Sequence, residues 1–313
     1  MSFLCIDFGG TYIKFGVVTG DEEIKHFDRI PTKAEKGANF VLSRLVDVIF
    51  RMISEFDIEA VSIAVASPLD PNRGILYNPP NLPGFGVFDL KGYLEDRVPV
   101  PVFIDNDANL YALGEYFKGA GRGSKVMVVL TLGTGIGGGI VYDGKVWHGA
   151  HGFGGELGHI TIDPGGPRCN CGNYGCLEAL GSTKFLVEFV RDRLKEGMAS
   201  ICVFVRDRLD GRAIYECAKE GDSLAIEAFS RLGVNLGIGI ATIANIFDPD
   251  CIVIGGGLSR AWEFFWESMM DEFKKRALPS QAEYCSIKRA ELGDLSAIWG
   301  GYYRIKNLRG GVL

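Results

Sequence analysis

The sequence predicts an α/β protein with two domains, and three observations lead to that prediction. Apolar runs suited to strands alternate along the chain with segments of helical periodicity, which is typical of α/β proteins. Two of these runs, residues 3–6 and 126–132, are each followed by a Gly- and Thr-rich turn and a returning strand, which indicates an internal duplication. The length of 313 residues suggests about two domains.

We place the domain boundary near residue 108, where the turn Asp105–Asp107 leads into a helix. A smaller N-terminal domain then covers residues 1–108, and a larger C-terminal domain covers residues 109–313. We expect the last helix of the chain to pack back on the N-terminal domain.

The N-terminal domain is predicted to begin with a β-hairpin. Its first strand is Phe3–Ile6, its tight turn lies at Gly9 and Gly10, and its second strand is Tyr12–Val18, where apolar residues alternate. Apolar residues at helical spacing then predict a helix. The further elements expected here are a helix over 38–54, strands over 61–66 and 100–104, and a helix over 108–117.

The second half is predicted to continue the alternation. Strand 126–132 and return strand 140–142 form a second hairpin around the turn Gly133–Gly139. We further expect helices over 182–194, 222–247, 262–275 and 294–303, the last capped by Asp294, and strands over 251–254 and 284–289. Residues 189–194 recur as residues 204–209, an echo that has no functional explanation.

The apolar run Leu232–Phe247 is the segment most similar to a membrane span. It contains two asparagines and is too short to cross a bilayer, so we interpret it as a buried helix. Its glycines Gly233, Gly237 and Gly239 predict close packing against neighbouring helices.

Composition excludes several classes of protein. A hydrophobic content of 47% with 23% charged residues is that of an ordinary soluble globular protein. The net charge is −6 and the basic residues are scattered, so we expect no nucleic-acid partner. The N-terminus has no features of a signal peptide, and we expect a cytoplasmic protein without a membrane partner. Scattered thiols fit a reducing compartment; they are Cys5, Cys202, Cys217, Cys251 and Cys285.

A dense group of potential metal ligands lies between residues 151 and 178. His159 and the thiols of Cys169, Cys171 and Cys176 are a complete tetrahedral set for Zn²⁺, which leaves no open position and predicts a structural site. The zinc would hold a Gly-rich loop that carries the polar side chains of Glu156 and Glu178. The alternative is a buried histidine beside free core cysteines.

Three Gly-rich turns, each after an apolar strand, favour nucleotide binding. They lie at Gly9–Thr11, Gly133–Gly135 and Gly255–Gly257, and their exposed backbone N–H groups suit phosphate oxygens. Asp7, just before the first turn, would then hold Mg²⁺ through water; the alternative is an ordinary turn carboxylate.

Asp107 is the candidate general base. A hydroxyl that accepts a phosphoryl group needs a carboxylate within hydrogen-bond reach. The alternative is that Asp105 or Asp107 only caps the following helix, and the sequence leaves the two possibilities open.

The motifs together resemble the ROK family (repressors, open reading frames and kinases), within the actin-like/hexokinase ATPase superfamily. The resemblance covers essentially the whole chain, and the cysteine motif is its most specific part. The motifs that carry it are Asp7-Phe8-Gly9-Gly10-Thr11, Asp105-Asn106-Asp107-Ala108-Asn109, Gly133-Thr134-Gly135-Ile136-Gly137-Gly138-Gly139, Gly155-Glu156-Leu157-Gly158-His159 and Cys169-Asn170-Cys171-Gly172-Asn173-Tyr174-Gly175-Cys176-Leu177-Glu178.

The resemblance implies two actin-like (ribonuclease H-like) domains with a cleft between them and the zinc loop in the larger one. It implies an ATP-dependent hexose kinase, most simply a glucokinase, in which Asp107 takes the proton of the sugar 6-hydroxyl. The resemblance implies a homodimer or homotetramer. The implied sugar ligands are Asn81, Asn106, Asp107, Glu156, His159 and Glu178; Gly9, Gly10, Thr11, Gly133, Thr134 and Gly135 hold phosphates, and Gly256 and Gly257 lie near the adenosine.

Two departures and two alternatives accompany this prediction. Tyr12 stands where the family often has Lys, and we do not assign that role to Lys14; Ala66-Ser67-Pro68 replaces the usual Pro-Gly near the sugar.

Other possible substrates are N-acetylmannosamine, N-acetylglucosamine, fructose or a β-glucoside. A sugar-responsive repressor or non-catalytic sensor is the alternative from another class, which we disfavour because the first turn begins at Asp7 and leaves no room for a DNA-binding motif, and because Asp107 is present.

Overall fold

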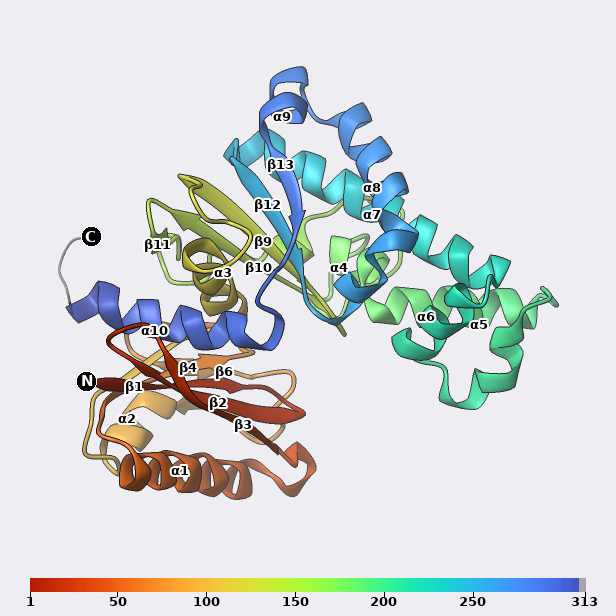
Figure 1. The fold of residues 1–313 in the computed structure, drawn as a ribbon. Helices are drawn as coiled ribbons and strands as arrows, with labels where there is room; N and C mark the ends of the chain where they lie inside the picture. Colours follow the sequence, from red (N-terminus) through yellow and green to blue (C-terminus); the bar gives the residue numbers. More distant parts are fainter. Residues whose placement is uncertain (310–313) are drawn as a thin grey trace. The chain divides into compact units, whose positions relative to one another are not determined.

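The computed structural model describes residues 1–309, and its contacts divide the chain into two compact units (Figure 1). Among the described residues, unit 1 contains Met1–Met127, Gly139–Gly155 and residues 291–309. Unit 2 contains Val128–Gly138 and Glu156–Ala290.

Unit 1 is built on a five-stranded sheet of order β3-β2-β1-β4-β8. Strands β1 (Ser2–Phe8), β2 (Tyr12–Thr19) and β3 (Ile24–Pro31) form an antiparallel meander, and β4 (Ile58–Val65) and β8 (Val102–Asn106) continue the sheet in parallel with β1. The predicted hairpin is therefore confirmed. The order places the ends of β1 and β8, and thus Asp7 and Asn106, on the same carboxyl edge of the sheet.

Helices cover both faces of this sheet (Figure 1). Helix α1 (Ala38–Glu55) buries Val41, Leu45, Ile49 and Met52 at helical spacing, in one apolar cluster with alternate residues of β1 and β2. Helix α10 (Ser296–Arg309) packs on the other face, where Gly301 lies against Cys5 and Ser62. The expectation that the last helix returns to the N-terminal part of the chain is met.

Helix α3 (Asp107–Phe117) also belongs to unit 1, because it packs closely along α10. A Cβ atom at Gly114 would lie 1.9 Å from the carbonyl oxygen of Ser296, and one at Gly300 would lie 1.7 Å from that of Leu110. These glycines let the two backbones touch. The compact units therefore differ from the expected division at residue 108, since this contact holds α3 with the preceding strands.

Unit 1 also carries a small antiparallel sheet and a short helix that the sequence analysis did not identify. The strands are β5 (Leu69–Asp70), β6 (Ile75–Tyr77) and β7 (Val87–Asp89), followed by α2 (Leu90–Glu95). Strands of two or three residues are too short to show an alternating pattern.

The second five-stranded sheet has the order β11-β10-β9-β12-β13. Strands β9 (Val126–Leu132) and β12 (Cys251–Gly255) match the prediction, and β11 is Lys145–Val146. Strand β10 (Ile136–Tyr142) confirms the predicted return strand but begins within the predicted turn, four residues earlier than expected. Strand β13 is Ser286–Arg289, shorter than expected because α9 (Pro279–Tyr284) takes up the preceding residues. The division between the units falls within β9 and β10.

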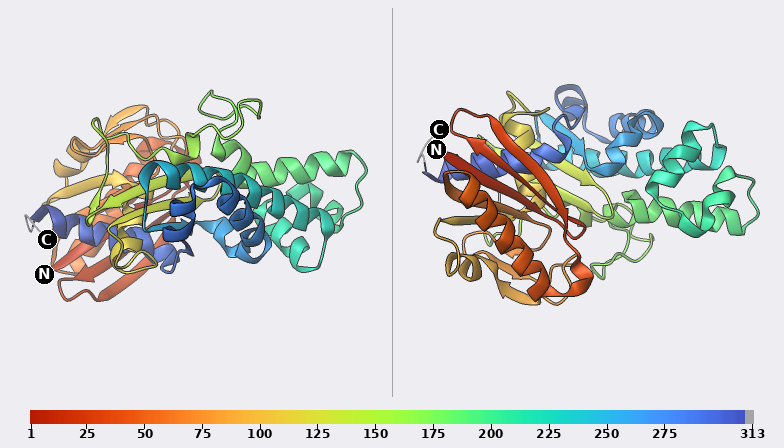
Figure 2. Two further views of the ribbon diagram at one scale, coloured as in Figure 1. Left: turned by 90° about the horizontal axis from the view of Figure 1, so that it is seen from above. Right: turned by 60° about the horizontal axis from the view of Figure 1, so that its bottom comes forward.

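The helices of unit 2 gather around α7 (Ser223–Phe247), which packs along α8 (Trp262–Arg276) (Figure 2). Gly233 and Gly237 face α8 and Gly239 faces Leu177, so the predicted close packing is confirmed. The other helices in contact with α7 are α4 (Leu177–Gly181), α5 (Thr183–Lys195) and α6 (Gly211–Lys219), and the 3-10 helix η3 (Ile201–Arg208) packs on α5 and α6.

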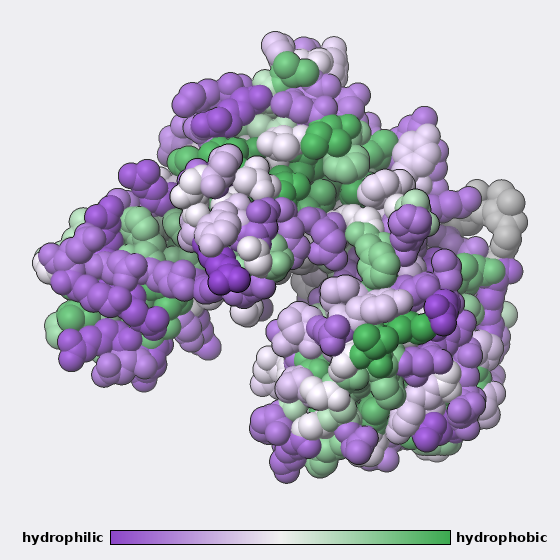
Figure 3. All heavy atoms as spheres, turned by 180° about the vertical axis from the view of Figure 1, so that it is seen from behind, coloured by the Kyte–Doolittle hydropathy of each residue, from purple (hydrophilic) through white to green (hydrophobic). Residues whose placement is uncertain are grey.

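Helix α7 has 25 residues, so the argument that its apolar segment is too short to cross a bilayer is wrong. By length and composition alone it passes that test, yet 61% of its most apolar window is buried in the structure. The prediction of a buried helix is confirmed. On the face shown in Figure 3, hydrophobic residues form separate patches among hydrophilic ones.

Candidate active site and metal cluster

The turn at the end of β8 presents two of the predicted substrate residues. Asn106 is the N-cap of α3, and its Oδ1 accepts hydrogen bonds from the N–H groups of Ala108 at 2.9 Å and Asn109 at 3.4 Å. Asp107 is the first helical residue and is half-buried. The alternative in which Asp105 or Asp107 only caps the helix is therefore wrong, because the cap is Asn106 and Asp105 is buried.

The loop that departs from the family pattern supports this turn. Asn106 Nδ2 donates to the carbonyl oxygen of Ser67 at 3.2 Å, and the Ser67 hydroxyl donates to the carbonyl oxygen of Pro68. The loop thus orients the Asn106 amide through its backbone.

The first Gly turn, Gly9–Thr11, lies against Asn81. A Cβ atom at Gly10 would come within 2.7 Å of the Asn81 carbonyl oxygen and 2.8 Å of its Cβ, so only glycine fits there. The hydroxyl of Thr32, the residue that follows β3, donates to the Gly9 carbonyl oxygen at 2.6 Å and fixes the turn. Unit 1 therefore brings together Asn81 and the turn that was predicted to hold phosphate.

Asp7 is engaged by Lys14. Its Oδ2 lies 3.1 Å from Lys14 Nζ, which also lies 3.0 Å from Oδ1 of Asp294. Burial raises the pKa of Asp7, although the Lys14 charge opposes that shift. Asp294 forms part of this ion-pair group in a 3-10 turn before α10, instead of capping the helix as expected.

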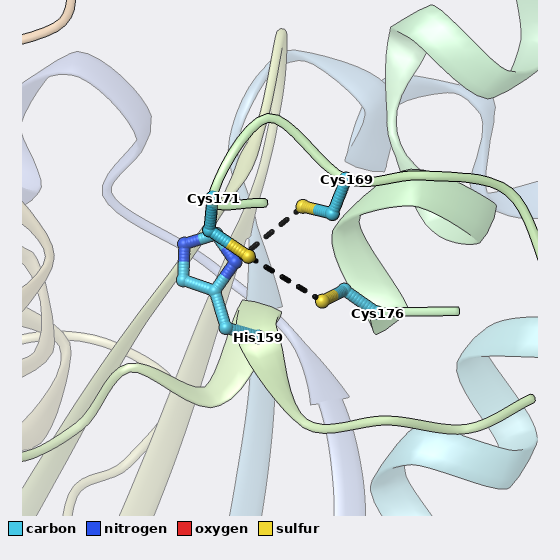
Figure 4. A group of neighbouring side chains, drawn as sticks. All are labelled: His159, Cys169, Cys171 and Cys176. Carbon is cyan, nitrogen blue, oxygen red and sulfur yellow. Dashed lines mark hydrogen bonds between the residues drawn. The ribbon is translucent and has the colours of Figure 1, made fainter. Parts of the chain in front are cut away.

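In unit 2, the four predicted metal ligands converge (Figure 4). The ligand atoms of His159, Cys169, Cys171 and Cys176 all lie within 4.8 Å of one another. Cys171 Sγ and Cys176 Sγ are 3.7 Å apart, as are Cys169 Sγ and His159 Nδ1. A tetrahedral zinc site with the usual bond lengths has ligand separations of about 3.6–3.8 Å. This donor set therefore fits Zn²⁺, with Nδ1 as the histidine ligand.

The acidic residues expected near the sugar lie beside this cluster. The Oε2 atom of Glu156 is 3.9 Å from His159 Nε2, the ring nitrogen that faces away from the sulfurs. Burial raises the pKa of Glu156; the negative charge of Glu178 adds to that shift and His159 opposes it. Glu178 Oε2 accepts a hydrogen bond from the Ile136 N–H at 3.0 Å, and its Oε1 is 3.6 Å from Cys169 Sγ.

Two of the Gly turns line one cavity of unit 2, with a volume of about 500 Å³. Gly133 and Gly257 both face it. Gly256 has φ +81°, and a Cβ there would lie 2.3 Å from the Leu132 carbonyl oxygen, so the turn requires glycine. Sequence reasoning did not identify the other residues of the wall, which include Thr183, Asp210, Gly211, Arg212, Tyr215, Glu216, Phe229, Leu258, Arg260 and Ala261. They come mostly from α6 and η4 (Gly257–Ala261), which carry no motif.

Comparisons with known proteins give similar full-length relatives. The chain is 34% identical to a glucokinase of Halalkalibacterium halodurans, over 97% of this chain and 94% of the relative. It is 33% identical to a glucokinase of Thermotoga maritima, over 99% of both. Less similar matches include a xylose repressor of Caldicellulosiruptor bescii, at 29% identity over 96% of this chain and 76% of the repressor.

Among solved structures, a ROK family glucokinase from Streptomyces griseus in complex with glucose and AMPPNP superimposes with a TM-score of 0.83. It is 31% identical, over 96% of this chain and 98% of that one. This chain thus shares the two-domain α/β fold of ROK kinases. The profile of the ROK family matches residues 3–307, which confirms the sequence-based prediction: the chain belongs to the ROK family.

Proposed function

We propose that this protein is an ATP-dependent hexose kinase that transfers the γ-phosphate of ATP to the 6-hydroxyl of glucose. The observation that carries the proposal is that one chain contains both a carboxylate at a fixed turn, Asp107 in unit 1, and a cavity within unit 2 that is lined by two Gly turns. Full-length similarity to two glucokinases supports glucose as the acceptor. The glucokinase structure with AMPPNP supports ATP as the donor.

The cavity of unit 2 is the proposed nucleotide site. Backbone N–H groups at Gly133–Gly135 would receive phosphate oxygens, and the Gly256–Gly257 turn would lie near the adenosine. Phe229 and Tyr215 offer ring faces for a base, and Arg212 and Arg260 add positive charge in the wall. The Gly9–Thr11 turn would hold phosphate from unit 1.

Asp107 is the proposed general base. It would accept the proton of the 6-hydroxyl as the sugar oxygen bonds to the γ-phosphorus, while the bond between that phosphorus and the bridging oxygen breaks and ADP leaves. Mg²⁺ neutralises phosphate charge in such reactions, and Asp7 is the carboxylate of this chain that would hold it through water.

Asn81, Asn106, Glu156, His159 and Glu178 are the proposed ligands of the remaining sugar hydroxyls, which both donate and accept hydrogen bonds. His159 Nδ1, Cys169, Cys171 and Cys176 would hold a structural Zn²⁺, whose role would be to fix this loop. No chemical step depends on that ion.

A coupled assay of ADP release tests the proposal, with ATP, Mg²⁺ and a panel of glucose, N-acetylglucosamine, N-acetylmannosamine, fructose and xylose. We expect glucose to give the highest kcat/KM. A higher kcat/KM with another sugar would replace glucose as the proposed acceptor but would still support the kinase activity. Sugar binding by calorimetry without turnover of any sugar would favour the sensor function of the repressor relatives.

A further inference from the structure

The carboxylate of Asp105, at the end of β8, accepts hydrogen bonds from its own turn and lies against two residues from distant parts of unit 1, His148 and Arg304. It is fully buried, and its Oδ1 accepts hydrogen bonds from the Asn106 N–H at 2.8 Å and from Asn109 Nδ2 at 3.1 Å. Its Oδ2 lies 2.8 Å from Nε2 of His148 and 3.1 Å from Nε of Arg304. Neither His148 nor Arg304 belongs to a motif that sequence analysis singled out.

The electrostatics of the group keep this carboxylate ionised. Burial by itself would raise the pKa of Asp105, but the hydrogen bond with His148 and the charge of Arg304 outweigh burial and hold the pKa below its usual value. An ionised carboxylate only accepts hydrogen bonds, so Nε2 of His148 carries the proton in this contact. Loss of that donor would leave a buried oxygen without one of its partners.

Asp105 holds the turn on both sides of Asp107. One donor to its Oδ1 is the backbone N–H of Asn106, the residue before Asp107, and the other is the side chain of Asn109, two residues after Asp107. Asn106 in turn caps α3, so the backbone that carries Asp107 is fixed by one connected set of hydrogen bonds. His148 is anchored separately, since its carbonyl oxygen accepts from the Gly154 N–H at 2.8 Å.

We propose that His148 is a positioning residue for the reaction: through Asp105 it fixes the turn that aims the Asp107 carboxylate at the acceptor hydroxyl. This inference rests on the proposed kinase function. A general base works only at hydrogen-bond distance, and a misplacement of about 1 Å costs up to about 100-fold in rate. Removal of the His148 donor therefore lowers kcat more than it weakens substrate binding.

The test compares His148→Phe with His148→Gln. Phenylalanine keeps the ring and removes the donor, whereas the glutamine amide can place an N–H near the position of Nε2. We expect His148→Phe to lower kcat by about 10- to 100-fold, with KM for glucose and ATP within about threefold. His148→Gln should recover most of the lost kcat. Glucose binding, measured by calorimetry, should be retained in both variants.

His26→Phe is the matched control. His26 is also a partly buried histidine of unit 1, with its ring against Phe15 and Phe56, and its Nε2 has no hydrogen-bond partner among the described residues. We expect its kcat to stay within about twofold of wild type. An unchanged kcat in His148→Phe, or a loss that His148→Gln does not recover, would overturn the inference. The proposed function is tested separately by the wild-type protein alone. A wild-type protein that phosphorylates no sugar would overturn that function whatever the variants do.

Discussion

Oε2 of Glu178 accepts a hydrogen bond from the N–H of Ile136 at 3.0 Å, which joins the metal cluster to the second Gly turn. Cys176, a proposed metal ligand, is the N-cap of α4, and Glu178 lies in the first turn of that helix. Gly135 leaves room for the carboxylate, since a Cβ there would lie 2.3 Å from Oε2. The loop that zinc would hold is thus attached to the turn proposed to bind phosphate.

Substitution of Glu178 is therefore expected to affect both substrates. Glu178→Ala removes the acceptor for the Ile136 N–H and should raise KM for ATP as well as for glucose, each by about 3- to 10-fold, as for the loss of one or two hydrogen bonds. Steady-state kinetics with each substrate varied in turn measures the effect. Glu196→Ala, which removes an exposed ion pair with Arg193, is the control and should change neither constant. A rise in KM for glucose alone, with KM for ATP unchanged, would show that the hydrogen bond between Glu178 and Ile136 does not affect ATP binding.

Asp107→Asn should abolish most phosphorylation and retain sugar binding. The amide cannot accept the hydroxyl proton, and loss of a general base typically costs about 10²- to 10⁴-fold in kcat. The ADP-release assay gives the rate, and calorimetry gives the glucose affinity.

Asp89→Asn is the matched control for that variant, because Asp89 caps α2 and asparagine is an equally good cap. It should keep full activity. Wild-type turnover in Asp107→Asn would exclude this residue as the base.

The purified protein should contain one zinc ion per chain by elemental analysis, because the four ligand atoms lie within 4.8 Å of one another and two of their separations, 3.7 Å each, match a tetrahedral zinc site. Cys171→Ser should lose the metal and lower Tm, since metal binding contributes to folding free energy. Cys285→Ser, at a buried thiol outside the cluster, should keep the metal. A folded wild-type protein of full Tm without zinc would contradict the assignment.

Gly256→Ala should destabilise unit 2, and Gly257→Ala should not. Gly256 has φ +81° and its Cβ would collide with the Leu132 backbone, whereas a Cβ at Gly257 has open space. Strain of this kind costs about 1–3 kcal/mol in the free energy of unfolding. Urea unfolding followed by circular dichroism measures both. Equal stability of the two variants would contradict the described turn.

The sequence predicted the elements whose periodicity is strong and whose surroundings are apolar on one side. Helix α1 and strand β1 are examples, because one face of each packs on the apolar core. Apolar residues therefore recur every three or four positions in the helix and every second position in the strand. Strand β3 was missed because it is largely exposed and its polar residues blur the alternation. Helix α6 was missed because its nine residues carry no motif, although it contributes much of the wall of the proposed nucleotide cavity.

The sequence by itself determined the family, the four residues of the His/Cys cluster and the Gly turns, because each of these rests on short motifs whose residues lie close together along the chain. Only the tertiary structure decided that Asn106 caps α3 while Asp105 is buried against His148 and Arg304. These two partners lie 43 and 199 residues away along the chain, so no local pattern shows which of the neighbouring carboxylates they bind. It also decided that Glu178 binds the backbone of Ile136. Burial makes an unpaired polar atom costly, so the fold, and not the local motif, selects the partner of each buried group.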